Sequence, residues 1–138
     1  MANKKAYVLD SFALLAYLQG EAGMTRVQQT LEDSQKGRSL VSICVINLGE
    51  VLYIIERERG MVKAQEALAA IQQLPMEILP AHEQIVFAAA HIKANHALSY
   101  ADAFAVTCAQ NQNAILLTGD KEFESVESLV SVEWLPKN

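Results

Sequence analysis

The sequence has little of what several common protein classes need. Its two cysteines, Cys44 and Cys108, lie apart in apolar stretches without a C-x-x-C pair, which argues against a disulfide framework and a thiolate metal site. No apolar run is long enough to span a bilayer, because polar residues such as Asn47 and Glu50 interrupt the best candidates. A signal peptide is not expected, since Asp10 ends the first apolar run too early. These absences predict a reduced, cytoplasmic protein without a membrane segment.

Histidine and positive charge are also scarce. The three histidines, His82, His91 and His96, form no helical i, i+4 pair, so a zinc site is not expected. The net charge of −5 argues at first against a nucleic-acid partner, which usually requires a basic surface. Two bound divalent ions would add four positive charges, bring the formal total to about −1, and turn the most acidic spot into an anion site.

The hydrophobic residues are numerous enough for one compact domain. They make up 51% of the 138 residues, and no repeat, low-complexity tract or linker marks a boundary, so residues 1–138 are predicted to form a single domain. Short apolar strands are predicted at 6–9, 40–41, 76–79, 114–117 and 130–135, and helices at 11–18, 24–36, 42–59, 61–74, 82–95 and 99–111. This alternation predicts an α/β fold of three layers, a mainly parallel sheet flanked by helices, with ligands beyond the carboxyl ends of the strands.

Glu50 is the most informative acid in the sequence. Residues 43–55 are apolar on nearly every face of a helix, which predicts that the helix is buried. A buried carboxylate is costly unless its charge is compensated, and no lysine or arginine lies three or four positions away. A metal ion or a distant arginine could compensate it, and the metal is favoured. Asn47, one turn earlier on the same face, could reach the same site or a bound water.

Three further acids each have an ordinary structural explanation beside the functional one. Asp10 follows the strand at 6–9 and could simply cap the next helix. Asp102 completes the capping-box spacing that begins at Ser99, although its neighbours again describe a buried helix. Asp120, in Thr-Gly-Asp-Lys, has the typical sequence of a turn, but it comes just past a buried strand.

Together, the four acids Asp10, Glu50, Asp102 and Asp120 predict a metal site. Two follow strand ends and two lie in helices that should cover the sheet, so all four could converge at one rim. Without metal, such carboxylates repel one another and their pKa values should rise. Oxygen ligands alone favour Mg²⁺ or Mn²⁺ over zinc, so we expect one or two of these ions.

The order and context of these acids resemble the PIN-domain nucleases. The resemblance lies in Val-Leu-Asp10-Ser11, Asn47-Leu-Gly-Glu50-Val, Tyr100-Ala-Asp102-Ala and Leu-Thr118-Gly-Asp120-Lys-Glu122-Phe, which together span nearly the whole chain. The length is most similar to that of the VapC-type toxins of toxin-antitoxin pairs. The resemblance implies a PIN fold, metal-dependent endoribonuclease activity on RNA, a homodimer, and an antitoxin partner whose tail lies over the active site.

The resemblance also implies roles for single residues. It makes Asp10, Glu50, Asp102 and Asp120 the acidic quartet. Ser11 and Thr118 match hydroxyl positions that support the site, and Glu122 matches a position that is often a further acid. Phe12 departs from the pattern, because many relatives have a polar residue there, and this departure concerns substrate contacts more than the metal ligands.

We expect hydrolysis without a covalent nucleophile, since no serine or cysteine is paired with a histidine. Asp10, Asp102 and Asp120 would bind metal directly, and Glu50 would be a ligand or a base acting through a water on the metal. Ser11 and Thr118 would orient the ligands. Three alternatives stay open: a stand-alone RNA-processing nuclease, a non-catalytic metal-binding module, and a signalling domain that is phosphorylated on Asp10 but lacks the expected paired acids near its first strand.

Overall fold

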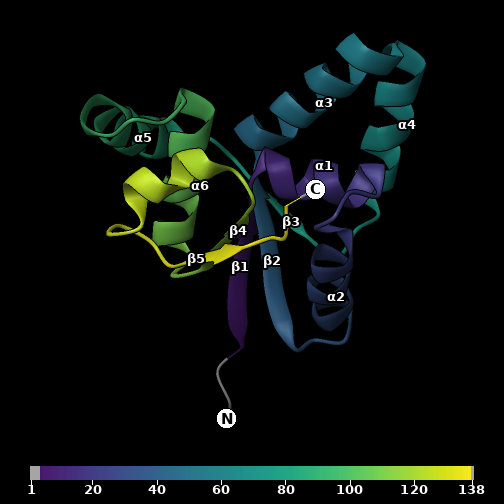
Figure 1. Ribbon diagram of the computed structural model, residues 1–138, viewed down its shortest axis with the longest axis horizontal. Coiled ribbons are helices and arrows are strands. Elements are labelled where there is room, and N and C mark those ends of the chain that lie inside the picture. Colours follow the sequence, from purple (N-terminus) through teal and green to yellow (C-terminus); the bar gives the residue numbers. More distant parts are fainter. Residues whose placement is uncertain (1–3, 138) are drawn as a thin grey trace.

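The computed structural model describes residues 4–137, which form a five-stranded sheet with helices on both faces (Figure 1). The strands are β1 (Lys5–Leu9), β2 (Ser39–Cys44), β3 (Glu77–Leu79), β4 (Ile115–Thr118) and β5 (Val132–Trp134). Their order in the sheet is β3-β2-β1-β4-β5, and every neighbouring pair is parallel. The predicted α/β class is confirmed, with a sheet that is wholly rather than mainly parallel.

The helices form two layers around this sheet. They are α1 (Ser11–Gln19), α2 (Met24–Gln35), α3 (Val45–Arg59), α4 (Met61–Gln72), α5 (Glu83–Asn95) and α6 (Tyr100–Asn111), followed by the 3-10 helix η1 (Lys121–Val126). Neighbouring strand residues point to opposite faces: Val8 packs in the core under α5 and α6, and Leu9 in the core under α1 and α2. None of the helices within residues 4–137 is long and apolar enough to cross a membrane.

Two segments differ from the sequence prediction. The helix predicted from residue 42 begins only at Val45, because residues 42–44 continue β2 and pair with β3. The predicted start of the helix at residue 42 is therefore wrong. The reason is that a short apolar run has no periodicity by which a buried strand can be told from a buried helix. The 3-10 helix η1 was not predicted, since six residues are too few to show a helical pattern.

The strand order creates a crevice at the carboxyl edge of the sheet. The chain runs from β1 to β2 and β3 on one side, and later returns to β4 and β5 on the other side of β1. The order therefore reverses between β1 and β4, and in open parallel sheets ligands bind at such a switch point. Asp10 follows β1 and Asp120 follows β4 closely, so both acids lie at this edge.

Candidate active site

Asp10 lies at the switch point with hydrogen bonds to both carboxylate oxygens. Its Oδ1 accepts the Ala13 backbone N–H at 2.8 Å, and its Oδ2 accepts the Thr118 hydroxyl. The side chain thus caps α1, as its ordinary explanation predicted. Asp10 is only 1% exposed, and this burial raises its pKa from 3.8 to about 8, against the effect of the two hydrogen bonds and with a contribution from Asp102 and Asp120.

Three other carboxylates converge beside Asp10. One oxygen each of Asp102, Asp120 and Glu122 lies within 4.8 Å of the others. We call these three residues the acidic trio. The Asp120 carboxylate accepts the Glu122 N–H at 3.0 Å, and the Glu122 carboxylate accepts the Ser99 N–H at 2.9 Å. Asp102 is buried, Asp120 half-buried and Glu122 exposed, so the acidic trio is open to solvent on the side of Glu122.

Asp102 combines a structural and an electrostatic feature. The Ser99 hydroxyl accepts the Asp102 N–H at 3.1 Å and caps α6, which confirms the cap predicted at Ser99. Burial, followed by repulsion from Asp120, raises the pKa of Asp102 from 3.8 to about 7, and the contact with Ser99 opposes this rise. Glu122 and Glu50 add smaller repulsions. The Asp102 carboxyl therefore faces several acids.

Glu50 is less buried than its sequence predicted. Packing covers only part of α3: Leu48 and Val51 are buried, whereas Val45, Ile46 and Tyr53 are exposed, and Glu50 is half-buried. The argument that burial forces a compensating charge on Glu50 was therefore wrong.

The Glu50 carboxylate is held near the acidic trio without belonging to it. The Ser11 hydroxyl donates to Glu50 Oε1 at 2.5 Å, and the Tyr53 hydroxyl lies 3.5 Å from Oε2. The Tyr53 contact was not recognised in the sequence, although its i, i+3 spacing from Glu50 could have revealed it.

Asn47 and Thr118 hold the elements of the site together. The Asn47 amide donates to the Ala101 carbonyl at 3.0 Å and so ties α3 to the first turn of α6. Its Oδ1 is buried and has no hydrogen-bond partner among the described residues. The Thr118 hydroxyl donates to Asp10 and accepts the Asp120 N–H at 3.0 Å, so one side chain connects both acids at the switch point.

Phe12 fills the space beside Gly119. A Cβ atom at Gly119 would lie 2.3 Å from Cε1 of the Phe12 ring, closer than any real contact allows. The aromatic residue that departs from the family pattern is therefore matched by a glycine between Thr118 and Asp120. The ring packs against the turn that carries Asp120 and does not replace any of the acids.

A divalent metal ion fits this set of donors. All the converging groups are carboxylate oxygens, which Mg²⁺, Mn²⁺ and Ca²⁺ prefer. The ion pairs found among residues 4–137 are Arg26 with Glu133 and Lys63 with Glu66, so none of the site acids is neutralised by a described lysine or arginine. Burial and, to a smaller extent, repulsion among the acids raise the pKa values of Asp10 and Asp102, and a bound cation would counteract both effects.

Known structures share this fold over nearly the whole chain. VapBC from Salmonella typhimurium bound to DNA matches with a TM-score of 0.74 at 17% identity, over 94% of this chain and 97% of that chain. VapBC2 from Rickettsia felis bound to a promoter DNA fragment matches with a TM-score of 0.73 at 16% identity, over 95% of this chain and 99% of that chain. VapC20 from Mycobacterium tuberculosis, a sarcin-ricin loop cleaving toxin, matches with a TM-score of 0.66 at 18% identity, over 87% of this chain and 94% of that chain.

The sequence itself also matches a known family. No curated protein matches it. The PIN-domain family model, however, matches residues 7–129, a range that runs from β1 past η1 and includes Asp10, Glu50, Asp102, Asp120 and Glu122. Because this match covers most of the sequence and the fold agrees, the chain belongs to the PIN-domain family.

Proposed function

We propose that this protein is a metal-dependent endoribonuclease that hydrolyses RNA phosphodiester bonds, and that it is the toxin of a toxin-antitoxin pair. The observation that carries the proposal is the convergence of Asp102, Asp120 and Glu122 within 4.8 Å, beside Asp10, at the switch point of a PIN-domain fold. Mg²⁺ or Mn²⁺ is the proposed cofactor, because the donors are all oxygens.

The residues divide into ligands and supporting groups. Asp102 and Asp120 would hold the ion together with Asp10, and Glu122, which the sequence suggested as a supporting acid, becomes a proposed ligand. An ion held by these residues would neutralise charge on the phosphate and favour deprotonation of an attacking water. Glu50 is half-buried and accepts the Ser11 hydroxyl, so it can orient this water or take up its proton. Thr118 and Asn47 keep the ligand-bearing segments in place.

The similar structures support the biological context of the proposal. Two of them are VapBC toxin-antitoxin systems, and VapC20 is a toxin that cleaves the sarcin-ricin loop. By analogy we propose an antitoxin partner, RNA as substrate, a homodimer and a cytoplasmic location. A gene beside this one whose product rescues growth when the chain is induced would support the antitoxin, and light scattering at twice the 15.2 kDa of one chain would support the dimer.

The nuclease is tested with mixed cellular RNA, including transfer RNA, in the presence of Mg²⁺, Mn²⁺ or a chelator. The wild type is compared with an Asp10→Asn, Asp102→Asn double variant and with a control of equal charge change on α2, Glu32→Gln with Asp33→Asn. Discrete metal-dependent cuts by the wild type and the control, lost in a still-folded double variant, are expected. If no condition gives cleavage and metal does not raise the melting temperature, the proposal fails and the signalling and binding alternatives return.

A further inference from the structure

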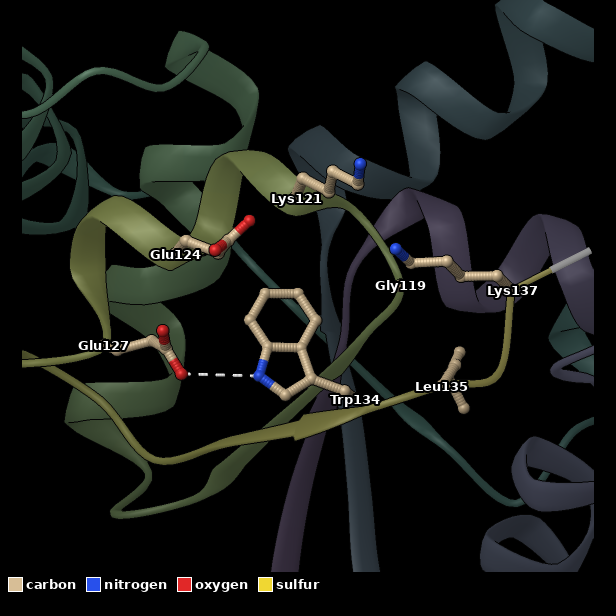
Figure 2. Close-up of a pocket in the computed structure, with 7 residues that line it drawn as sticks. All are labelled: Gly119, Lys121, Glu124, Glu127, Trp134, Leu135 and Lys137. Atoms are coloured by element: carbon tan, nitrogen blue, oxygen red, sulfur yellow. Dashed lines mark hydrogen bonds between the residues drawn. The ribbon is translucent and has the colours of Figure 1, made fainter.

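A pocket beside the acidic trio has features that the metal site does not use. It is lined by Gly119, Lys121, Glu124, Glu127, Trp134, Leu135 and Lys137 (Figure 2), and its volume is about 260 Å³. Gly119 and Lys121 flank Asp120 in the chain, so the pocket and the acidic trio share the segment between β4 and η1. A molecule in this pocket would therefore lie next to the proposed metal site.

Trp134 stands in the middle of the pocket. It is the only tryptophan of the chain, it is 40% exposed, and it pairs in register with Thr118, the residue that holds Asp10. Its indole N–H donates to Glu127 Oε2 at 3.3 Å, which restrains the ring (Figure 2). A restrained, exposed aromatic ring beside a phosphodiester-cleaving site can serve as a platform on which a nucleic-acid base stacks.

Charges of opposite sign lie at the two ends of the pocket. Lys121 and Lys137 come from separate segments and bring their amino groups toward one end, whereas Glu124 and Glu127 lie beyond Trp134 at the other end (Figure 2). Neither lysine forms an ion pair with any described residue. Two unpaired cations suit a phosphate group, and the carboxylates can accept hydrogen bonds from an amino group on a base.

We propose that this pocket binds one nucleotide of a single-stranded RNA substrate next to the scissile phosphate. The base stacks on Trp134, its amino group faces Glu124 and Glu127, and a phosphate lies between Lys121 and Lys137. The inference rests on the proposed nuclease function and adds a substrate preference: bases that carry an amino group, such as adenine, over uracil.

Size and charge both favour this occupant. The volume is below the roughly 300 Å³ at which pockets for drug-sized ligands begin, so one base fits better than a longer segment. A basic peptide would gain from the two glutamates, but Lys121 and Lys137 would repel it.

The sole tryptophan makes a direct test possible. Ten-nucleotide single strands of oligo(A) and oligo(U) are titrated into the full chain with chelator, so that no cleavage occurs, while Trp134 emission is followed. We expect oligo(A) to quench the emission and to bind more tightly than oligo(U). The Lys121→Gln, Lys137→Gln double variant should bind oligo(A) about tenfold more weakly, and its salt slope should be lower by about 0.7, because the contact with one phosphate is lost.

A matched control separates this effect from net charge. Lys36→Gln with Arg38→Gln removes the same charge just before β2, at the opposite edge of the sheet, and should leave the binding of oligo(A) unchanged. Equal weakening by both double variants would overturn the subsite. A Trp134→Leu variant, followed by anisotropy of labelled oligo(A), should also bind more weakly while its melting temperature shows that it is folded.

The outcomes distinguish the pocket from the nuclease. If metal-dependent cleavage proceeds but RNA leaves the emission unchanged, the subsite is wrong and the nuclease stands. If oligo(A) quenches the emission but no metal supports cleavage, the nuclease is wrong and the pocket remains a nucleotide site. Quenching by an arginine-rich peptide and not by RNA would assign the pocket to a protein partner and overturn the proposal.

Discussion

Carboxylates lie in two opposite electrostatic environments in this chain. Glu133, in β5, accepts two hydrogen bonds from the Arg26 guanidinium, at 2.5 Å from Nε and 3.0 Å from Nη2, and this cation lowers the pKa of Glu133. Asp10 and Asp102 face other acids instead, and burial raises their pKa values to about 8 and about 7. One carboxylate is neutralised from within the fold, and the others are not.

The contrast shows where the fold leaves charge for an external ion. An arginine beside Asp102 would make the metal-free protein more stable, and its absence leaves the cost of gathering the acids uncompensated. Such a cost is tolerable if a bound cation normally removes it, as proposed here. The following predictions test this difference between a carboxylate that is paired with an arginine and carboxylates that are proposed to bind a metal ion.

The largest expected effect belongs to Asp102→Asn. Cleavage should fall at least about 100-fold, because this residue is a proposed metal ligand and even indirect partners of a metal commonly contribute 10- to 100-fold. The metal-free variant should melt at a higher temperature than the wild type at pH 8, since a buried charge beside Asp120 is removed. Cleavage is measured with Mg²⁺, and unfolding is followed by circular dichroism with chelator.

The same amide substitution on α2, Asp33→Asn, is the matched control and should change neither quantity markedly. Retained cleavage in Asp102→Asn would remove this residue from the metal site. A lower melting temperature of metal-free Asp102→Asn would mean that the Asp102 carboxylate, like that of Glu133, is stabilised by the fold itself. The proposed difference between the two environments would then be wrong.

The next largest effect is expected from Thr118→Val. This change removes the donor to Asp10 and the acceptor of the Asp120 N–H in one step. Metal affinity, measured by calorimetry, should fall by roughly 10- to 100-fold. Thr107→Val removes another buried hydroxyl, one that bonds only the Ala103 carbonyl of its own helix, and should leave the affinity near that of the wild type. Equal losses in both variants would indicate a packing effect instead.

Much of the fold could be predicted from the sequence because local patterns determine it. The strands at β1 and β4 are short apolar runs bounded by turn residues, and glycines and prolines mark several helix ends. The start of α3 could not be predicted, since the pairing of Ile43 with Ile78 decides it and these residues are distant in sequence. The exposure of Glu50 likewise depends on which face of α3 its neighbours cover.

The candidate site was predictable as a set of acids but not in its geometry. The strand ends place Asp10 and Asp120 at one edge, and the sequence context of Asp102 suggested a buried position, which the structure has. The carboxylate of Glu122 lies near those of Asp102 and Asp120 because η1 positions it, and no sequence pattern predicts this short 3-10 helix. The pocket at Trp134 depends on the register of β5 against β4, so residue spacing alone could not reveal it.

The third effect is a pH dependence of stability without metal. Between about pH 4 and pH 8, the unfolded chain has lost protons that folded Asp10 and Asp102 retain, because their pKa values of 3.8 rise to about 8 and about 7 on folding. Unfolding therefore releases protons, and the melting temperature should fall by at least about 5 °C as the pH rises through this window, because one unit of pKa shift alone corresponds to about 1.4 kcal/mol. Mg²⁺ should reverse the fall and stabilise more strongly at higher pH, because it competes with protons for the same oxygens.

Thermal melts at several pH values, with chelator and with Mg²⁺, measure this dependence. Asp10→Asn with Asp102→Asn should flatten the slope between pH 5 and pH 8. A metal-free wild type that becomes more stable across this window would show that the site acids behave like Glu133, and the proposed difference between the two environments would be lost.

The smallest effect is expected from a change of Arg26, the residue that pairs with Glu133. Arg26→Gln breaks both contacts with Glu133 and one with the Tyr7 hydroxyl at 3.2 Å. The side chains of Arg26 and Glu133 are 30% and 33% exposed, so solvent screens the pair and the loss at neutral pH should be at most about 1 kcal/mol.

Because the folded pKa of Glu133 is lowered, this stabilisation exists above its usual value of 4.5 and disappears as the pH falls through the folded value. A double-mutant cycle with Glu133→Gln, measured by urea unfolding at neutral and acid pH, should therefore give a coupling that vanishes in acid, while metal-dependent cleavage stays at the wild-type rate. A coupling that persists in acid would assign the contact to hydrogen bonding or packing between these two side chains rather than to charge, because the cycle cancels the contact of Arg26 with the Tyr7 ring, whose centre lies 5.5 Å away.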